Sequence, residues 1–188
     1  MLCFAMSGKM RSGKDSAADY IEHRLMSFGL QVKRLAFAET LKRIATYAQQ
    51  EAGVPQIKDR ELLQFIGVHF REINPEVWVD AVKRQIMEVV KEGETDAILI
   101  TDLRFQNEYE MLDNLGFTLI RTHASDDVRA GRGAEVAAMQ HISEIALDYL
   151  DRTPGSWDWF ITNESTLDEF YKVLELVIAK AQLEDQEF

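Results

Sequence analysis

Cysteine and proline are scarce in this sequence, which has one cysteine and three prolines among its 188 residues. The single cysteine, Cys3, cannot form an internal disulfide. Because it lies in the apolar run 2–6, we expect a small buried hydrophobic side chain in a reduced compartment. The sequence also lacks internal repeats and any linker rich in proline and glycine. These absences predict one domain spanning residues 1–188.

A net positive charge and long apolar runs are absent too. The formal net charge is −11, which argues against a nucleic-acid polymer as partner, because phosphate contacts require a basic face. A small nucleotide needs only a local cluster of arginine, lysine and backbone N–H groups, so it remains compatible. No basic segment precedes a long apolar stretch, and no run approaches the length of a membrane span. We therefore expect no signal peptide and no membrane partner.

Apolar runs and helical periodicity alternate along the chain. They predict strands at residues 2–6, 31–37, 97–101, 117–122 and 157–161, helices at 13–28, 39–51, 59–72, 75–91, 105–115, 135–150 and 166–181, and a polar loop at 124–135. This alternation is typical of an α/β protein with a parallel sheet covered on both faces. The strand-to-helix turns then lie at one edge of the sheet, where ligands bind.

The segment 8–15, G-K-M-R-S-G-K-D, follows a predicted strand and opens a predicted helix. This is the context of a phosphate-binding loop (P-loop). Gly8 and Gly13 let backbone N–H groups curl around phosphate oxygens, and the helix N-terminus adds its positive dipole end. Lys14 offers a mobile charge to the outer phosphates of a donor. The alternative is a glycine-rich turn without a ligand.

Position 15 departs from the usual motif, which has a serine or threonine hydroxyl there. Asp15 either serves Mg²⁺, directly or through water, or holds a water that bridges to a substrate phosphate, or caps the helix. Ser16 follows and is a second candidate metal ligand. A third is Asp102, at the end of a predicted strand, where an acidic residue meets Mg²⁺ or its waters.

Further candidates for the acceptor side surround the same predicted sheet edge. Arg104 is placed to clamp a phosphate with two hydrogen bonds, and Asn107 and Glu108 start the next helix near it. Alternatively, Asp102 is a helix cap and Arg104 a surface residue. Phe37 either stacks on a base or is a core residue. Lys42 either reaches a monophosphate or is a solvated surface lysine. Trp78 lies near the acceptor region but is more typical of a core residue.

Two arginines, Arg129 and Arg132, lie in the glycine-containing segment 126–133. A closing arginine lid would deliver charge to a moving phosphoryl group and exclude water. The alternative is a solvated loop of mixed charge. Glu144, in the segment H-I-S-E, either orients the lid arginines or the acceptor, or is a carboxylate favoured by the dipole of a helix start.

Taken in order, six segments resemble the deoxynucleoside monophosphate kinases of phages. They are S-G-K-M-R-S-G-K-D-S-A-A-D-Y-I (7–21), F-A-E-T-L-K (37–42), L-L-Q-F-I-G (62–67) followed by W-V (78–79), I-T-D-L-R-F-Q-N-E (100–108), H-I-S-E (141–144) and F-I-T-N-E-S-T-L-D-E-F (160–170). More distantly, the chain resembles dephospho-coenzyme A kinase and phosphomevalonate kinase, which share the loop and a late strand ending in asparagine.

The resemblance implies a P-loop NTPase fold of the nucleoside monophosphate kinase type. Its features would be three α/β/α layers, a five-stranded parallel sheet, acceptor-binding helices at about 39–92 and a lid at about 124–140. It implies transfer from ATP, with Mg²⁺, to a deoxynucleoside monophosphate. It also implies small-molecule nucleotide partners, a possible homodimer and a cytoplasmic location, in the host cytoplasm if the chain is phage-encoded. The rival readings are a kinase for another small acceptor, such as a coenzyme precursor or modified-base nucleotide, and an inactive nucleotide-binding protein.

The residue patterns and the resemblance together predict the site residues. Those expected to hold ATP are Gly8, Lys9, Arg11, Ser12, Gly13, Lys14, Asp15, Ser16 and, near adenine, Asn163. Those expected to bind the acceptor are Phe37, Lys42, Trp78, Asp102, Arg104, Asn107, Glu108 and Glu144. Those expected to act in catalysis are Lys14, Asp15, Arg104, Arg129 and Arg132.

Overall fold

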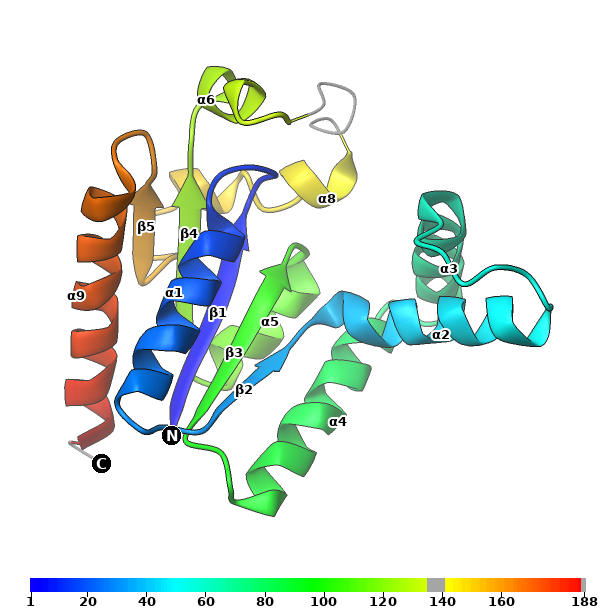
Figure 1. Cartoon of the computed structure of the whole chain (residues 1–188), viewed down its shortest axis with the longest axis horizontal. Coiled ribbons are helices and arrows are strands. Elements are labelled where there is room, and N and C mark those ends of the chain that lie inside the picture. The colour runs from blue at the N-terminus through cyan, green and yellow to red at the C-terminus, as the bar shows by residue number, and fades with distance from the viewer. Residues whose placement is uncertain (135–140, 187–188) are drawn as a thin grey trace.

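A single parallel sheet organises the chain, whose computed structural model describes residues 1–134 and 141–186. The strands are β1 (Leu2–Gly8), β2 (Val32–Leu35), β3 (Ala97–Leu103), β4 (Thr118–His123) and β5 (Trp159–Thr162), in the order β2-β3-β1-β4-β5. Each neighbouring pair is parallel. The predicted five-stranded parallel sheet is confirmed, with β1 at its centre (Figure 1).

Helices cover both faces of the sheet. Their bounds are α1 (Lys14–Ser27), α2 (Phe37–Glu51), α3 (Arg60–Ile73), α4 (Val77–Glu92), α5 (Gln106–Asn114), α6 (Asp126–Gly131), α8 (Ile142–Ile145) and α9 (Leu167–Gln186), with a 3₁₀ turn η1 (Leu150–Arg152). Side chains of α1 and α9 form one core with the sheet, and those of α4 and α5 form the other. This arrangement is the expected α/β/α sandwich. In the described part of the chain, no helix is both long and apolar enough to cross a membrane.

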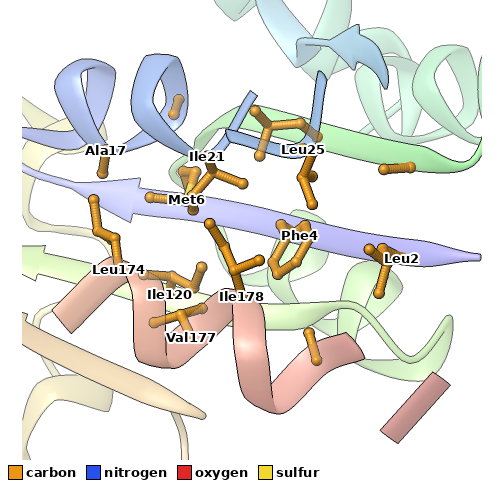
Figure 2. Close-up of a cluster of buried hydrophobic side chains, with 14 of the residues drawn as sticks. Leu2, Phe4, Met6, Ala17, Ile21, Leu25, Ile120, Leu174, Val177 and Ile178 are labelled. Carbon is orange, nitrogen blue, oxygen red and sulfur yellow. The ribbon is translucent and has the colours of Figure 1, made fainter. Parts of the chain in front are cut away.

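The core between β1, α1 and α9 holds the start of α1 in place (Figure 2). Phe4 and Met6 of β1 pack against Ile21 and Leu25 of α1 and Leu174 of α9, and all five side chains are fully buried. Burying each of them contributes about 1.5–3 kcal/mol. Because β1 and α1 are both anchored, the loop that joins them is held at the carboxyl edge of the sheet.

Helices α2 and α3 form an arm that projects from the sheet (Figure 1). The arm has its own small core, in which Ala45 and Ile66 pack with Trp78 from the start of α4. Asp59 accepts a hydrogen bond from Leu62 N at 3.0 Å and so caps α3, as its position in the sequence predicts.

The region after β4 differs from the prediction. Within the expected loop 124–135, residues 126–131 form α6, in which the acidic first turn suits the helix N-terminus. The prediction of a helix over residues 135–150 is wrong from residue 141 onward, where α8, turns and η1 replace it. Residues 135–140 lie outside the described residues, and with them part of the lid expected at 124–140. Tertiary ion pairs outweigh helical propensity here, because Asp148 pairs with Lys9 and Arg121, and Asp151 pairs with Arg121.

Candidate active site

Both glycines of the phosphate loop are required by close packing. A Cβ on Gly8 would lie 2.2 Å from Thr122 Oγ1. Gly13 has a φ of 101°, and a Cβ there would lie 2.1 Å from Asn163 Nδ2. The loop therefore rests against the ends of β4 and β5, and only residues without a side chain allow this contact.

The N-terminus of α1 opens directly from this loop. Gly13 is its N-cap, and within the described residues no side chain hydrogen-bonds to the cap. The first N–H groups of a helix have no intrahelical partner, and the helix dipole favours negative charge at this end. The start of α1 can therefore receive an anion, as the motif predicts.

Lys14 and Asp15 meet at the mouth of the loop. The Lys14 ammonium is largely buried, with its Nζ 2.9 Å from Thr101 O and 2.6 Å from Asp15 Oδ1. Desolvation acts to raise the pKa of the Asp15 carboxyl, but its hydrogen bond to Lys14 and the charges of Lys14 and Arg104 outweigh this, so the pKa lies below its ordinary value. Asp15 is therefore ionised at neutral pH and has most of its side chain open to solvent.

A cavity of about 760 Å³ surrounds the loop, and we call it the donor cavity. It is lined by Lys9, Met10, Arg11, Gly13, Lys14, Asp15, Ser16, Lys58, Arg104, Arg132, Asn163, Ser165 and Leu167. Of the predicted loop residues, Ser12 instead faces the sheet, with its Oγ 2.8 Å from Thr122 Oγ1. Lys58, in the segment before α3, was not predicted as a site residue, because no motif or spacing around it indicates a binding role.

Asn163 and Arg132 form one wall of the donor cavity. The buried Asn163 amide donates from Nδ2 to Ser12 O at 2.9 Å, and Arg132 Nη2 donates to Asn163 O at 3.0 Å. Arg132 Nη1 also donates to Arg11 O at 3.3 Å. The turn after β5 and the segment after α6 are thus both attached to the phosphate loop.

The second predicted lid arginine, Arg129, does not line the donor cavity. Its side chain is only 2% exposed, because α6 packs it against the loop. Nε donates to Met10 O at 2.9 Å, and Nη1 lies 2.7 Å from Asp126 Oδ1. The two arginines therefore have different places. Arg132 lines the donor cavity, and Arg129 binds the backbone of the phosphate loop outside that cavity.

Asp102 caps the N-terminus of α2, the first helix of the arm. Its two carboxylate oxygens accept hydrogen bonds from Phe37 N at 2.8 Å and Ala38 N at 2.9 Å, at the N-terminus of α2. It does not line the donor cavity, so the structure favours the cap among the readings of this residue.

Arg104 and Glu144 connect the sheet edge to the phosphate loop. Arg104 Nη1 donates to Ser143 O at 3.0 Å and pairs with the Glu144 carboxylate, whose other oxygen accepts from Met10 N. Glu144 is buried, so this pairing satisfies its charge. Glu144 therefore sets the position of Arg104 relative to the loop, a role that differs from the two predicted for it, which were orienting the lid arginines or the acceptor.

A second cavity, of about 380 Å³, lies between the arm and the sheet edge, and we call it the acceptor cavity after the role expected for this region from the sequence. It is lined by Met10, Ala38, Leu41, Lys42, Lys58, Arg60, Leu63, Gln64, Gly67, Val68, Arg71, Arg104, Phe105, His141, Ser143 and Glu144. Met10, Lys58 and Arg104 line both cavities, so the two are neighbours. Arg71 was not predicted, although its helical spacing from residues 63, 64, 67 and 68 was a signal that could have found it.

Glu108 lies behind the acceptor cavity and not in it. Its side chain is 3% exposed, and Oε2 accepts from Arg104 N at 2.9 Å and Phe105 N at 3.0 Å. Oε1 lies 3.5 Å from Arg71 Nη2. Burial raises the pKa of this carboxyl to about 8. Glu108 therefore joins α3 to the start of α5, whereas the sequence predicts that it contacts the substrate directly.

Three other predicted acceptor residues also lie away from the cavity. Phe37 and Trp78 are 4% and 2% exposed and belong to the two cores beside α4, so neither ring is available for stacking. Asn107 Nδ2 donates to Pro75 O at 3.2 Å and Glu76 Oε1 at 3.1 Å, which ties α5 to α4. Lys42 is exposed and does line the acceptor cavity.

Comparison with solved structures bears on the fold. A structure described as "Crystal structure of APE1195" matches with a TM-score of 0.51 and 16% identity over 96% of each chain, which speaks for the fold alone. Shikimate kinase from Acinetobacter baumannii, in complex with shikimate, matches with a TM-score of 0.48 and 12% identity over 96% of this chain and 95% of that one.

Comparison with known sequences bears on the family. ORF77 of Ictalurid herpesvirus 1 (strain Auburn) is 31% identical over 167 residues, covering 88% of this chain and 65% of that protein. A putative deoxynucleotide monophosphate kinase of Acanthamoeba polyphaga mimivirus is 25% identical over 200 residues, covering 91% and 93%. The chain spans less than two thirds of ORF77 and 44% of ORF76 from the same herpesvirus. The sequence model of the family described as "Deoxynucleotide monophosphate kinase" matches residues 54–174, more than half of the chain. With its phosphate loop at the edge of a five-stranded parallel sheet, the chain therefore belongs to the deoxynucleotide monophosphate kinase family and has the P-loop kinase fold.

Proposed function

We propose that this chain transfers the terminal phosphoryl group of ATP to the phosphate of a 2′-deoxynucleoside 5′-monophosphate, giving ADP and the diphosphate. The observation that carries this proposal is the pair of cavities that share Met10, Lys58 and Arg104. One cavity contains the phosphate loop and the other has a cationic lining, so two phosphorylated molecules can bind with their phosphates facing each other. Family membership supports the same reaction.

The donor cavity suits the triphosphate of ATP. Backbone N–H groups of the loop and of the start of α1 would bind the phosphates, and Lys14 would pair with the outer ones. Asn163 lies at the same wall and would border the adenine. Arg132 would add positive charge from the segment after α6.

The residues present fit a Mg²⁺ ion bound with the nucleotide. Asp15 and Ser16 both line the donor cavity and offer oxygen ligands, and the Asp15 carboxylate, whose pKa is lowered further by Lys14, is ionised at neutral pH. In residues 1–134 and 141–186, no group of three or more His, Cys, Asp or Glu side chains could hold a metal. Mg²⁺ commonly takes one or two protein ligands with phosphates and waters, so this sparse set is sufficient. When bound, the ion would neutralise charge on the phosphates.

The residues between the cavities would stabilise transfer by charge and position. The acceptor phosphate is already an anion at neutral pH, so no strong general base is needed. Arg104, fixed by Glu144 to the loop, would hold it in line with the donor, while Lys14 would stabilise charge on the moving group. Asp102 would act through the arm, by keeping the start of α2 at the sheet edge.

The test is a panel of acceptors with ADP release measured in the presence of ATP and Mg²⁺. We expect turnover with at least one of the four common 2′-deoxynucleoside 5′-monophosphates. Absence of turnover with all four, beside turnover of a coenzyme precursor or a modified-base nucleotide, would show that the acceptor is another small molecule.

Lys14→Ala tests the mechanism. We expect kcat to fall by about a hundredfold or more, because the donor loses the cation beside its outer phosphates. Lys83→Ala, which changes an exposed lysine on α4, is the matched control and should leave kcat unchanged. Equal rates for Lys14→Ala and the unchanged protein would contradict the proposed role of the loop.

A further inference from the structure

One face of α3 forms a long wall of the acceptor cavity. The wall residues recur at helical spacing, and they are Arg60, Leu63, Gln64, Gly67, Val68 and Arg71. Its two ends are cationic and its middle is neutral. Part of the motif L-L-Q-F-I-G (62–67) lies on this face, and the proposed chemistry so far assigns it no role.

The Arg71 end of the wall is the one tied to Arg104. Arg71 stacks on the Phe105 ring, with its guanidinium carbon 4.3 Å from the ring centroid. It also lies 3.5 Å from the Glu108 carboxylate that accepts the Arg104 N–H. The Arg71 side chain is still 31% exposed, and it lines the acceptor cavity. A phosphate placed there would meet two arginines beside the donor cavity.

The middle of the wall suits a nucleobase. Gln64 lies seven residues before Arg71, about 10.5 Å along the helix, which approximates the span from the phosphate to the far, hydrogen-bonding edge of the base in a nucleotide. Its exposed amide offers both a donor and an acceptor to a base edge. Leu63 and Val68 lie beside it and supply apolar surface for the base.

Gly67 lets α3 pack closely against α2 at this part of the wall. A Cβ at this position would lie 3.0 Å from Leu41 Cδ1 on α2 and 3.8 Å from Arg71 Nη1. Its carbonyl accepts hydrogen bonds from Arg71 at 3.0 Å and from Trp78 at 3.3 Å, so the arginine is held to the wall at the same residue.

We propose that the acceptor nucleotide lies along α3, with its phosphate between Arg71 and Arg104 and its base against Gln64. This orientation rests on the proposed function, because it takes the ligand to be a deoxynucleoside monophosphate. It assigns Arg71 to phosphate binding and Gln64 to base selection.

Calorimetric titration tests the phosphate end. The four 2′-deoxynucleoside 5′-monophosphates and the matching deoxynucleosides are titrated into the unchanged protein, Arg71→Lys and Arg71→Met. Loss of the forked donor should raise Kd for the monophosphates about tenfold or more, and leave Kd for the deoxynucleosides unchanged. Arg84→Met, on the exposed face of α4, is the control, and thermal melting checks that each variant is folded.

Gln64→Leu tests the base end. The order of Kd values among the four monophosphates should change, with about fivefold loss for at least one base, because a neutral hydrogen bond is removed. The phosphate contribution, measured as the ratio of nucleoside to monophosphate Kd, should stay the same. Glu72→Leu, on the exposed part of α3 outside the cavity, should change neither quantity.

The outcomes separate this orientation from the proposed function. If the unchanged protein neither binds nor phosphorylates any of the four monophosphates, both proposals fail. If it does both, and neither the Arg71 nor the Gln64 variants alter binding as stated, the orientation is wrong and the proposed function stands. A phosphate-specific loss in Gln64→Leu together with altered base ranking in Arg71→Met would indicate the reverse orientation.

Discussion

At the scale of single residues, the site depends on side chains that position other groups. Glu144, Arg129 and Asn163 each bond to the phosphate loop, at Met10 or Ser12. All three are buried, and these bonds to the loop satisfy part of their polar groups, although Arg129 Nη2 has no hydrogen-bond partner among the described residues. The charged groups that reach the cavities therefore keep defined places without a ligand.

Gly13→Ala should destabilise the fold more than Gly155→Ala. Both glycines have a positive φ, 101° and 79°, which costs an alanine about 1–2 kcal/mol. At Gly13 the new methyl group would also meet Asn163 Nδ2, whereas near Gly155 the described residues leave open space within 4 Å. Chemical denaturation measures the difference, and equal losses of stability would contradict the packing of the loop on Asn163.

Glu108→Gln should make stability less dependent on pH. The pKa of Glu108 is raised from 4.5 to about 8 in the folded protein, because burial disfavours the ionised form. The folded state therefore holds a proton that the unfolded state has lost, and stability falls as pH rises through this window. Denaturation at several pH values between about 5 and 8 measures the slope. An identical slope for both proteins would show that Glu108 is not the group responsible.

At the scale of elements, the arm of α2 and α3 is held by two aspartates from outside its helices. Asp102 caps α2 from the end of β3, and Asp59 caps α3. The arm has a smaller core than the sheet and carries one whole wall of the acceptor cavity. Its stability is therefore expected to affect acceptor binding more than donor binding.

Asp59→Ala tests this expectation. Loss of the cap should cost about 1 kcal/mol and loosen the start of α3. We expect KM for the deoxynucleoside monophosphate to rise while KM for ATP stays nearly constant. Asp59→Asn retains a capping oxygen and should keep KM for the deoxynucleoside monophosphate at the value of the unchanged protein. A parallel rise of the two KM values in Asp59→Ala would instead indicate that the arm also supports the donor cavity.

At the scale of the whole molecule, local and overall charge have opposite signs. The chain carries a formal charge of −11, yet Lys42, Lys58, Arg71 and Arg104 all line the acceptor cavity. At physiological ionic strength, screening acts over about 8 Å, so an anion in the cavity responds mainly to these nearby cations.

KM for the monophosphate acceptor should therefore rise with salt, despite the negative net charge. Steady-state rates between about 0.05 and 0.5 M NaCl measure this dependence. The binding of an uncharged deoxynucleoside over the same range is the control and should change little. A fall in KM with added salt would mean that repulsion by the whole protein dominates.

The order of residues alone was enough to predict the alternation of strands and helices, the phosphate loop, the cap at Asp59 and the family. These features depend on local spacing, on apolar periodicity and on short motifs, all of which are legible along the chain. The helix predicted over residues 135–150 was wrong from residue 141 onward for the same reason. The segment has a local helical pattern, but ion pairs of Asp148 with Lys9 and Arg121 override it.

Which chemical groups share a cavity became clear from the folded structure and not from local patterns. It brought Arg71 and Lys58 to the acceptor side, and placed Arg129, Phe37 and Trp78 behind the surfaces they had been expected to line. The physical reason is that a side chain's direction depends on which elements pack against it. That packing is set by contacts between residues far apart in the sequence, which no local pattern contains.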